Sequence, residues 1–201
     1  MKDSAPIANR QPSQAWRLFI SIELPREVGY KIKQHINALR RELPDARASW
    51  MREENLHLTL KFFGDTAVER VEAVSGALKA SADQIPPFEM ELGGCGVFPP
   101  RGKPSVLWIG INDQSGNLQK LYEALEDECV KAGFDRERRP FHPHLTIARL
   151  RQSHDSRCLA DLHRQVGFAP VKVTVEDVCL IRSELSPEGS RHTIIARHRL
   201  K

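Results

Sequence analysis

Two copies of a short His-x-Thr triplet are the residues of this chain best suited to chemistry. The first runs from His57 to Thr59 and the second from His144 to Thr146, each inside a short apolar run. In a β-strand, successive side chains point to opposite faces, so the His and Thr of one triplet share a face about 6–7 Å apart. The apolar residues between and after them point the other way, into a core. Each triplet therefore offers one imidazole and one hydroxyl from a rigid strand.

Two such faces brought together would surround a small anion with two acid/base groups. An unperturbed imidazole has a pKa of about 6.5, so one ring can accept a proton while the other donates one in the same turnover. The hydroxyls of Thr59 and Thr146 can donate hydrogen bonds to negative oxygens. Displacement at phosphorus needs no metal when both the nucleophile and the leaving oxygen are served by proton transfer. The residues therefore predict metal-free phosphodiester hydrolysis, with no cofactor.

Length and composition limit the alternatives. The chain has 201 residues, of which 40% are hydrophobic and 28% charged, and this is enough to bury a core. No apolar run approaches the ~20 residues of a membrane span, and residues 1–15 lack the hydrophobic stretch of a secretory signal, so we expect a disordered tail there. The four scattered cysteines form no Cys-x-x-Cys pair, which favours buried free thiols in a reducing cytoplasm over zinc or disulfides. The net charge of +4 mildly favours an anionic partner such as nucleic acid.

The elements that must position the triplets follow one another in a repeated order. Hydrophobic periodicity and turn residues predict, in the first part of the chain, a strand over 16–24, a helix over 26–43, the first His-x-Thr strand over 55–63, a helix around 71–78 and a strand over 88–98. In the second part they predict a strand over 106–111, a helix over 118–129, the second His-x-Thr strand, a helix around 159–166, and strands over 171–183 and 192–200. The loop 99–104 (PPRGKP) has the strongest turn signal and is the predicted junction of two lobes.

The spacing supports a duplication. From Leu18 to His57 is 57 − 18 = 39 residues, and from Val106 to His144 is 144 − 106 = 38 residues. We therefore predict a single domain over 16–201, made of two similar halves, about 16–104 and 105–201. A pseudo-twofold axis between the halves would set the two triplets face to face.

The sequence around the triplets resembles that of the two-histidine (2H) phosphoesterase superfamily. Within it, the chain is similar to the bacterial and archaeal RNA 2′,3′-cyclic phosphodiesterases, also called 2′-5′ RNA ligases, from about residue 16 to 200. The segments that carry this similarity are, in order, RLFISIELP, ENLHLTLKFFG, a glycine-containing stretch ending in VFP, RRPFHPHLTIARL and LIRSELSPEG. The resemblance implies an α+β fold with two lobes. Each lobe would be an antiparallel sheet with two outer helices, and the active-site cleft would lie between them.

The resemblance also implies a reaction, the hydrolysis of an RNA-terminal 2′,3′-cyclic phosphate to a 2′-phosphomonoester. His144 would be the proton acceptor that activates water, and His57 the proton donor to the leaving 3′ oxygen. Thr59, Thr146 and Arg149 would bind the phosphate. Run in reverse with a 5′-hydroxyl, the same site would give weak 2′-5′ ligation. Because the two motifs look alike, the sequence by itself does not distinguish the acid from the base.

Phe62, five residues after His57, would stack on the terminal base, although the neighbouring Phe63 leaves open which of the two rings is exposed. His142 stands where similar sequences commonly have Arg, so a phosphate contact there would be weakened or pH-dependent. A metal held by His142 and His144 is disfavoured, because no third and fourth ligand stands at a suitable spacing. The basic run over 136–139 either guides RNA into the cleft by its charge or is an ordinary solvated loop.

The sequence leaves other functions open, and some residues have no predicted role. The chain could be another 2H phosphodiesterase that acts on 2′-5′ oligoadenylate or a small cyclic nucleotide, or a non-catalytic RNA-binding module. We favour a cytoplasmic monomer that acts on RNA ends such as tRNA fragments, without membrane or metal. Trp50 and Trp108 are predicted to pack rather than to stack on bases. We predict surface positions without a role for His35, His154, His163 and His198.

Overall fold

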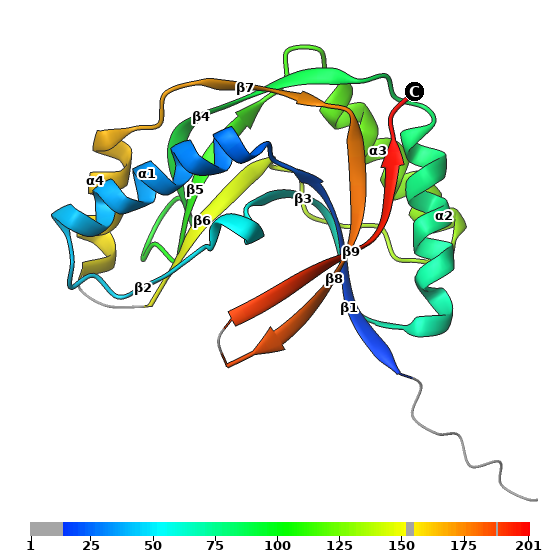
Figure 1. Cartoon of the computed structure of the whole chain (residues 1–201), viewed down its shortest axis with the longest axis horizontal. Helices are drawn as coiled ribbons and strands as arrows, with labels where there is room; N and C mark the ends of the chain where they lie inside the picture. Colours follow the sequence, from blue (N-terminus) through cyan, green and yellow to red (C-terminus); the bar gives the residue numbers. More distant parts are fainter. Residues whose placement is uncertain (1–13, 152–154, 188) are drawn as a thin grey trace, which may run out of the picture.

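The computed structural model describes residues 14–151, 155–187 and 189–201, so the predicted tail over 1–15 lies almost wholly outside the described part. Two antiparallel sheets dominate the fold (Figure 1). In spatial order, the strands of the first sheet are β3 (His57–Ala67), β1 (Ala15–Glu23), β8 (Asp177–Ser186) and β9 (Gly189–Arg199). The strands of the second sheet are β2 (Ala48–Trp50), β6 (His144–Leu150), β5 (Val106–Asn112), β4 (Phe88–Phe98) and β7 (Val171–Val175).

Helices cover the two sheets in pairs. Helices α1 (Arg26–Glu42) and α4 (Asp155–Val166) contact each other, and α4 packs on β4 of the second sheet. Helices α2 (Val71–Ala82) and α3 (Asn117–Lys131) contact each other, and α2 packs on β8 and β9 of the first sheet. Two short 3₁₀ helices, η1 (Glu53–Asn55) and η2 (Val68–Arg70), precede β3 and α2. The predicted α+β fold, with two antiparallel sheets and two helices on each, is confirmed (Figure 1).

The two sheets do not coincide with the two halves of the sequence. The loop 99–104 joins β4 to β5, which are hydrogen-bonded neighbours in one sheet, so the prediction of a lobe junction at this loop is wrong. Each half instead sends its first helix across the molecule. Strands β1 and β3 lie in the first sheet whereas the helix between them, α1, pairs with α4 beside the second, and α3 crosses in the opposite direction. A run of turn residues indicates that the chain reverses direction, but it does not indicate to which sheet the next strand belongs.

The predicted strand over 171–183 is also corrected, because it is two strands in different sheets. β7 pairs with β4 in the second sheet, and β8 pairs with β1 in the first. The chain changes sheets at Glu176, whose carbonyl accepts a hydrogen bond from the backbone N–H of Leu200. Along β7 every second residue is buried, as at Val173 and Val175, but the next buried residue, Val178, comes three positions later. No Gly or Pro marks this change.

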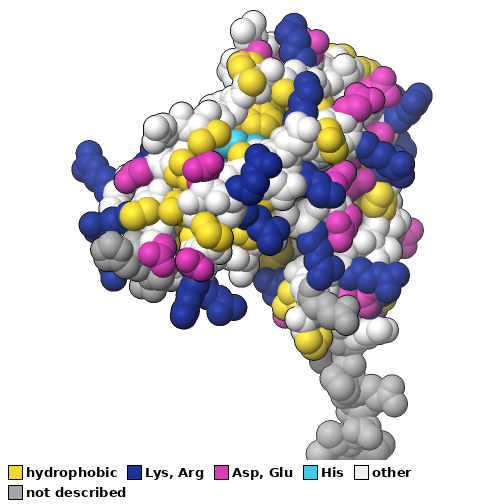
Figure 2. Space-filling view, turned by 60° about the vertical axis from the view of Figure 1, so that its left-hand side comes forward, with side chains coloured by type: hydrophobic (Ala, Val, Ile, Leu, Met, Phe, Trp, Pro, Cys, Tyr) yellow, Lys and Arg dark blue, Asp and Glu magenta, His cyan; other side chains and the backbone are white. Residues whose placement is uncertain are grey.

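The surface of the molecule carries mixed charges and some of its cysteines. On the face shown in Figure 2, Lys and Arg side chains interleave with Asp and Glu, and histidine atoms reach the surface between hydrophobic side chains. All four cysteines are free, as predicted, but only Cys129 and Cys179 are buried, while Cys95 is half-buried and Cys158 exposed. Within the described ranges, none of the helices combines the length and the apolar character that a membrane crossing requires.

Several residues that were expected at the surface lie inside. His35 is 8% exposed and His163 is fully buried, so the prediction for these two histidines is wrong. His198 is half-buried and hydrogen-bonds the hydroxyl of Ser75, while His154 lies outside the described residues. Long-range helix packing, which brings α1 and α4 together, covers polar positions that a single helix would leave in water.

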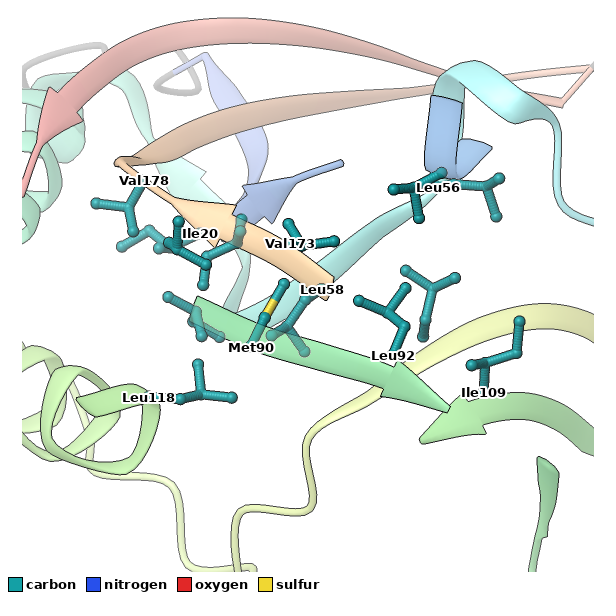
Figure 3. Packing of buried hydrophobic residues seen from close by; sticks show 14 of the residues in the cluster. Ile20, Leu56, Leu58, Met90, Leu92, Ile109, Leu118, Val173 and Val178 are labelled. Atoms are coloured by element: carbon teal, nitrogen blue, oxygen red, sulfur yellow. The ribbon is translucent and has the colours of Figure 1, made fainter. Parts of the chain in front are cut away.

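One hydrophobic core lies beneath both His-x-Thr strands. Leu58 and Leu60 of β3 belong to the same buried cluster as Leu145 and Ile147 of β6. Figure 3 shows side chains of both sheets and of α3 in this cluster. Burial of a Leu or Ile side chain stabilises a fold by about 1.5–3 kcal/mol. This packing holds the alternate residues of each strand, His and Thr, on the opposite face.

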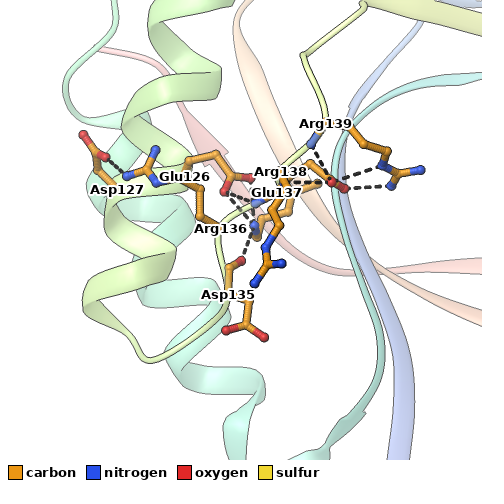
Figure 4. Close-up of polar contacts among 8 residues, drawn as sticks. Glu126, Asp127, Asp135, Arg136, Glu137, Arg138 and Arg139 are labelled. Atoms are coloured by element: carbon orange, nitrogen blue, oxygen red, sulfur yellow. Dashed lines mark hydrogen bonds and ion pairs between the residues drawn. The ribbon is translucent and has the colours of Figure 1, made fainter.

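A buried ion pair ties β3 to α3 and to the loop that follows α3. The ammonium of Lys61 lies 2.7 and 2.8 Å from the two carboxylate oxygens of Glu126, and the two side chains are 6% and 1% exposed. Lys61 also donates to the carbonyl of Asp135. The backbone N–H of Glu137 donates to the carboxylate of Glu126 (Figure 4). The pair therefore anchors the basic loop 135–139 directly beside the first motif.

We predict that Lys61→Met destabilises the fold by about 3–5 kcal/mol, because it leaves the carboxylate of Glu126 buried without its cation. Urea unfolding measures this change. A matched control is Lys172→Met, whose ion pair with Glu89 is exposed and should change the free energy of unfolding by less than about 1 kcal/mol. Similar decreases in the free energy of unfolding of the two variants would show that the buried pair contributes no more to stability than the exposed one.

Candidate active site

The strands that carry the two motifs lie beside each other. Pairs of residues from β3 and β6 approach within 8 Å between Cα atoms, although the strands belong to different sheets. Thr59 of the first motif and His144 of the second line the same open cleft, which has a volume of about 1340 Å³. One residue of each triplet, about ninety residues apart in the sequence, thus lies at the same cleft.

His57 stands on a small cluster of rings from three strands. Its ring stacks on Phe19 of β1 at a centroid distance of 4.7 Å, and the ring of His192 of β9 packs edge-on at a centroid distance of 5.3 Å. Burial is the main cause that lowers the pKa of His57 to about 4, and the neighbouring His192 lowers it further. A hydrogen bond to the backbone carbonyl of Asn55 opposes this shift. In the ligand-free protein the His57 ring is therefore neutral at pH 7.

His144 has a similar backbone contact and a more open position. Its Nδ1 lies 2.7 Å from the carbonyl oxygen of His142, two residues earlier, as Asn55 is two residues before His57. Since a carbonyl only accepts, Nδ1 carries the proton and Nε2 of neutral His144 is free to accept one. The ring of Phe98 packs edge-on against the His144 ring at a centroid distance of 4.9 Å, and the centroid of the Trp108 ring is 6.3 Å away. Each of the two histidines is thus oriented by the carbonyl of the residue two positions earlier, but the surroundings of the two rings differ.

A β-bulge after each triplet explains how the residue five positions after His reaches the His face. In the β1–β3 pair, Thr59 faces Ser21 and Lys61 faces Ile20, so the residue between them is extra. In the β5–β6 pair the same shift occurs after Thr146. An extra residue reverses the alternation of faces. In consequence Lys61 and Ala148 are buried, while Phe62 and Arg149 are exposed.

The structure distinguishes the two phenylalanines that the sequence left open. The ring of Phe62 is 53% exposed and lines the cleft. The ring of Phe63 is half-buried and packs edge-on against Phe134 of the core. The guanidinium of Arg17 lies 4.8 Å from the centre of the Phe62 ring. Phe62 is therefore the ring accessible to a ligand.

The predicted site residues contribute to the cleft unequally. Thr59, Phe62 and His144 are among its lining residues, whereas His57, Thr146 and Arg149 are not. His57 is screened by Phe19 and His192, and Arg149 points to solvent from the other end of β6. The first motif therefore presents its hydroxyl to the cleft more openly than its imidazole.

The basic run over 136–139 forms one wall of the cleft. Arg136 is paired with Asp127 of α3, and Arg139 makes a two-point contact with Glu137 (Figure 4). Arg138 and His142 line the cleft as well, and both are exposed. Part of the positive charge of the run is thus neutralised locally, and the remainder faces the open volume.

Sequence reasoning missed two residues that shape the surroundings of His57. His192 lies in β9, far along the chain, and its neighbourhood to His57 depends on the pairing of β8 with β1. The buried side chain of Asn55 donates a 2.9 Å hydrogen bond to the carbonyl of Ser190, which holds β9 against η1. The position of Asn55, two residues before His57, is a local sign that it could contact the motif. No pattern in the sequence indicates that His192 lies beside His57.

Comparison with known proteins shows the family to which the chain belongs. The family model of the 2′-5′ RNA ligase superfamily matches residues 28–187, and the chain belongs to that superfamily. The resemblance predicted from the motifs is confirmed. A relative from Methanothermobacter thermautotrophicus, named RNA 2′,3′-cyclic phosphodiesterase, is 32% identical over 92% of this chain and 98% of its own length. A relative of the same name from Thermotoga maritima is 31% identical over 89% and 92%.

Solved structures give the same result for the fold. The crystal structure of E. coli LigT complexed with 3′-AMP has a TM-score of 0.70 and 26% identity, covering 93% of this chain and 99% of that one. The crystal structure of TT0787 from Thermus thermophilus also has a TM-score of 0.70, with 27% identity over 92% and 97% of the two chains.

We predict that His192→Ala raises the pKa of His57 from about 4 toward its ordinary value. The substitution removes a neighbouring ring that both excludes water from His57 and repels its charged form. NMR titration of the His57 ring measures the shift. His198→Ala, on the same strand but next to Ser75, is the control and should leave this pKa unchanged. An unshifted His57 in the His192 variant would show that the two rings do not interact.

Proposed function

We propose that this protein hydrolyses RNA-terminal 2′,3′-cyclic phosphates to 2′-phosphomonoesters by acid/base catalysis with His57 and His144. The observation that carries the proposal is the single cleft lined by Thr59 from one motif and His144 from the other. The relatives named above carry the same enzyme name over nearly their whole length, which supports this class of reaction.

His144 fits the role of proton acceptor. Its Nδ1–H donates to the carbonyl of His142, so Nε2 can take a proton from water as the water oxygen attacks phosphorus. Water then forms the new P–O bond, and the bond from phosphorus to the 3′ oxygen breaks. The phosphate stays on the 2′ oxygen. Hydroxyls of Thr59 and Thr146 and the guanidinium of Arg149 bind the non-bridging oxygens in this scheme.

His57 fits the role of proton donor only when substrate is bound. Its pKa of about 4 keeps the ring neutral in the free protein, mainly because of burial. A phosphate anion close to the ring favours the charged imidazolium and raises this pKa. The imidazolium then protonates the leaving 3′ oxygen. Binding of the anionic substrate itself thus charges the acid.

The cleft favours an RNA end over a small nucleotide. Its volume of about 1340 Å³ exceeds the roughly 300–1000 Å³ of ordinary small-molecule pockets. Phe62 offers a ring for the terminal base, and Arg138 and His142 lie along the same opening. The alternative substrates, a 2′-5′ oligoadenylate or a free cyclic nucleotide, would use less of this surface. A 5′-hydroxyl in place of water would give the reverse 2′-5′ ligation, which bulk water makes the minor reaction. Action on tRNA fragments, a monomeric state and a cytoplasmic location stay predictions.

We predict that His57→Ala and His144→Ala each lower kcat by about 10²–10⁴-fold on an oligonucleotide with a 2′,3′-cyclic phosphate, since each removes one proton-transfer group. Circular dichroism checks that both variants are folded, and His198→Ala serves as the control with full activity. Turnover should persist in excess chelator. A variant that keeps its activity, or a loss in chelator restored by one metal ion, would overturn the two-histidine scheme.

We predict that Phe62→Leu raises KM for the RNA substrate by roughly 5- to 150-fold, which corresponds to the about 1–3 kcal/mol of one stacked base. The KM for a free 2′,3′-cyclic nucleotide, measured in parallel, shows whether the terminal base or the longer chain is the main determinant. Tyr30→Leu removes another exposed ring, on α1 and outside the cleft, and should have no effect. Equal KM values for wild type and Phe62→Leu would remove the ring from substrate binding.

A further inference from the structure

Three side chains of types that can bind a metal lie together, buried or half-buried, away from the two motifs. His35 of α1, Cys95 of β4 and His163 of α4 place one ligand atom each within 4.8 Å of one another. Nε2 of His35 is 2.9 Å from Nδ1 of His163, and Sγ of Cys95 is 4.0 Å from Nε2 of His35. Three separate elements therefore converge on one point.

The outer nitrogen of His163 is held as in metal-binding histidines. Nε2 of His163 lies 3.0 Å from the carbonyl oxygen of Trp108 in β5, so this nitrogen carries the proton and donates it. The lone pair of Nδ1 then points toward His35. Metal-ligating histidines almost always donate their other ring N–H to a backbone carbonyl, a carboxylate or water.

Cys95 is aimed into the group by a break in its strand. The register of β4 against β5 shifts between Gly93 and Cys95, and Gly94 between them has a φ of 70°. A residue with a Cβ adopts this conformation only with strain. Bulges of this kind re-aim a side chain. Here the side chain that follows the bulge is the thiol.

We propose that His35, Cys95 and His163 bind a divalent metal ion of the zinc class. Zinc bonds of about 2.0–2.1 Å to nitrogen and about 2.3 Å to sulfur, in tetrahedral geometry, require N···N distances of about 3.3 Å and N···S distances of about 3.6 Å. The observed 2.9 and 4.0 Å differ from these by a few tenths of an ångström, in opposite directions. The third pair of ligand atoms lies within the 4.8 Å span of the group. In this proposal, rotations of the side chains bring the three atoms to ligand spacing, and a ligand from outside the protein completes the tetrahedron.

Binding has a defined proton balance. The thiol of Cys95 gives up its proton to solvent and becomes a thiolate ligand. The proton between the two imidazoles moves to Nδ1 of His35, which leaves Nε2 free to bind. A hydrogen bond between the histidines accounts for the 2.9 Å contact by itself, but it gives no reason for the re-aimed cysteine beside it.

The site lies away from the two motifs, and it does not depend on the proposed hydrolysis. It joins α1, α4 and β4, and through the Trp108 carbonyl it reaches β5. The ring of Trp108 lies against Gly96 so closely that a Cβ there would stand 2.0 Å from it, and the same ring packs near His144. A bound ion would thus stiffen the outer support of the second motif, while the phosphate reaction proceeds without contact with it.

The test is metal uptake by the full chain. Metal-free protein is mixed with one equivalent of Zn²⁺, dialysed, and its zinc measured by mass spectrometry, and Co²⁺ is added to a second sample for absorption spectroscopy. Wild type should retain about one ion per chain and show a thiolate-to-cobalt charge-transfer band. Cys95→Ser and His163→Gln should lose both the ion and the band.

Two controls separate this site from other sources of binding. Cys158→Ser removes an exposed thiol outside the group and should behave as wild type. His144→Asn tests binding by the predicted catalytic imidazoles and should also keep the ion. Failure of wild type to retain zinc, or unchanged uptake and an unchanged cobalt band in Cys95→Ser, would overturn the proposal. The cobalt band of wild type reports a thiolate ligand directly, because nitrogen and oxygen ligands alone do not produce it.

Discussion

The structure depends on one shared hydrophobic core beneath both motif strands. Leu58 and Leu145, which follow the two histidines, are both buried in it, although their strands belong to different sheets. A strand whose alternate residues are fixed in a core has no freedom to slip by one position, since a slip would exchange its two faces. The core therefore determines that both His-x-Thr faces point away from it, and the contact between β3 and β6 places Thr59 and His144 at one cleft.

The paired bulges show why the motif extends beyond its triplet. In a regular strand, Phe62 and Arg149 would be in the core, because each stands at an odd distance from its histidine. The extra residue after Thr59 and after Thr146 turns both side chains outward. It also buries the residue before each of them, and in β3 this residue is Lys61, which meets Glu126 inside the protein. One local irregularity thus places a ligand-accessible ring and, through the buried ion pair, anchors the basic wall of the cleft.

What the sequence predicted was local, and what it missed depends on contacts between distant segments. The strand over 88–98 and the helix at 26–43 follow from periodicity and turn residues, and the structure places β4 and α1 within one residue of these bounds. The crossing of the chain between β7 and β8 has no such signal, because apolar residues continue through it. His35 and His163 were misplaced for the same reason, since each helix by itself gives no sign of the other.

The two motifs are alike in sequence but not in their surroundings, and this difference bears on their proposed chemical roles. Burial against Phe19 and His192 keeps the His57 ring neutral in the ligand-free protein, whereas His144 lines the open cleft. A group reached by water suits the activation of water. A group shielded from water suits protonation of a leaving oxygen. Its charged form is stabilised strongly by a bound phosphate, and the same form can then give its proton to the leaving oxygen. The asymmetry that the duplicated sequence conceals therefore arises from packing outside the motifs, where Phe19 of β1 and His192 of β9 surround the His57 ring.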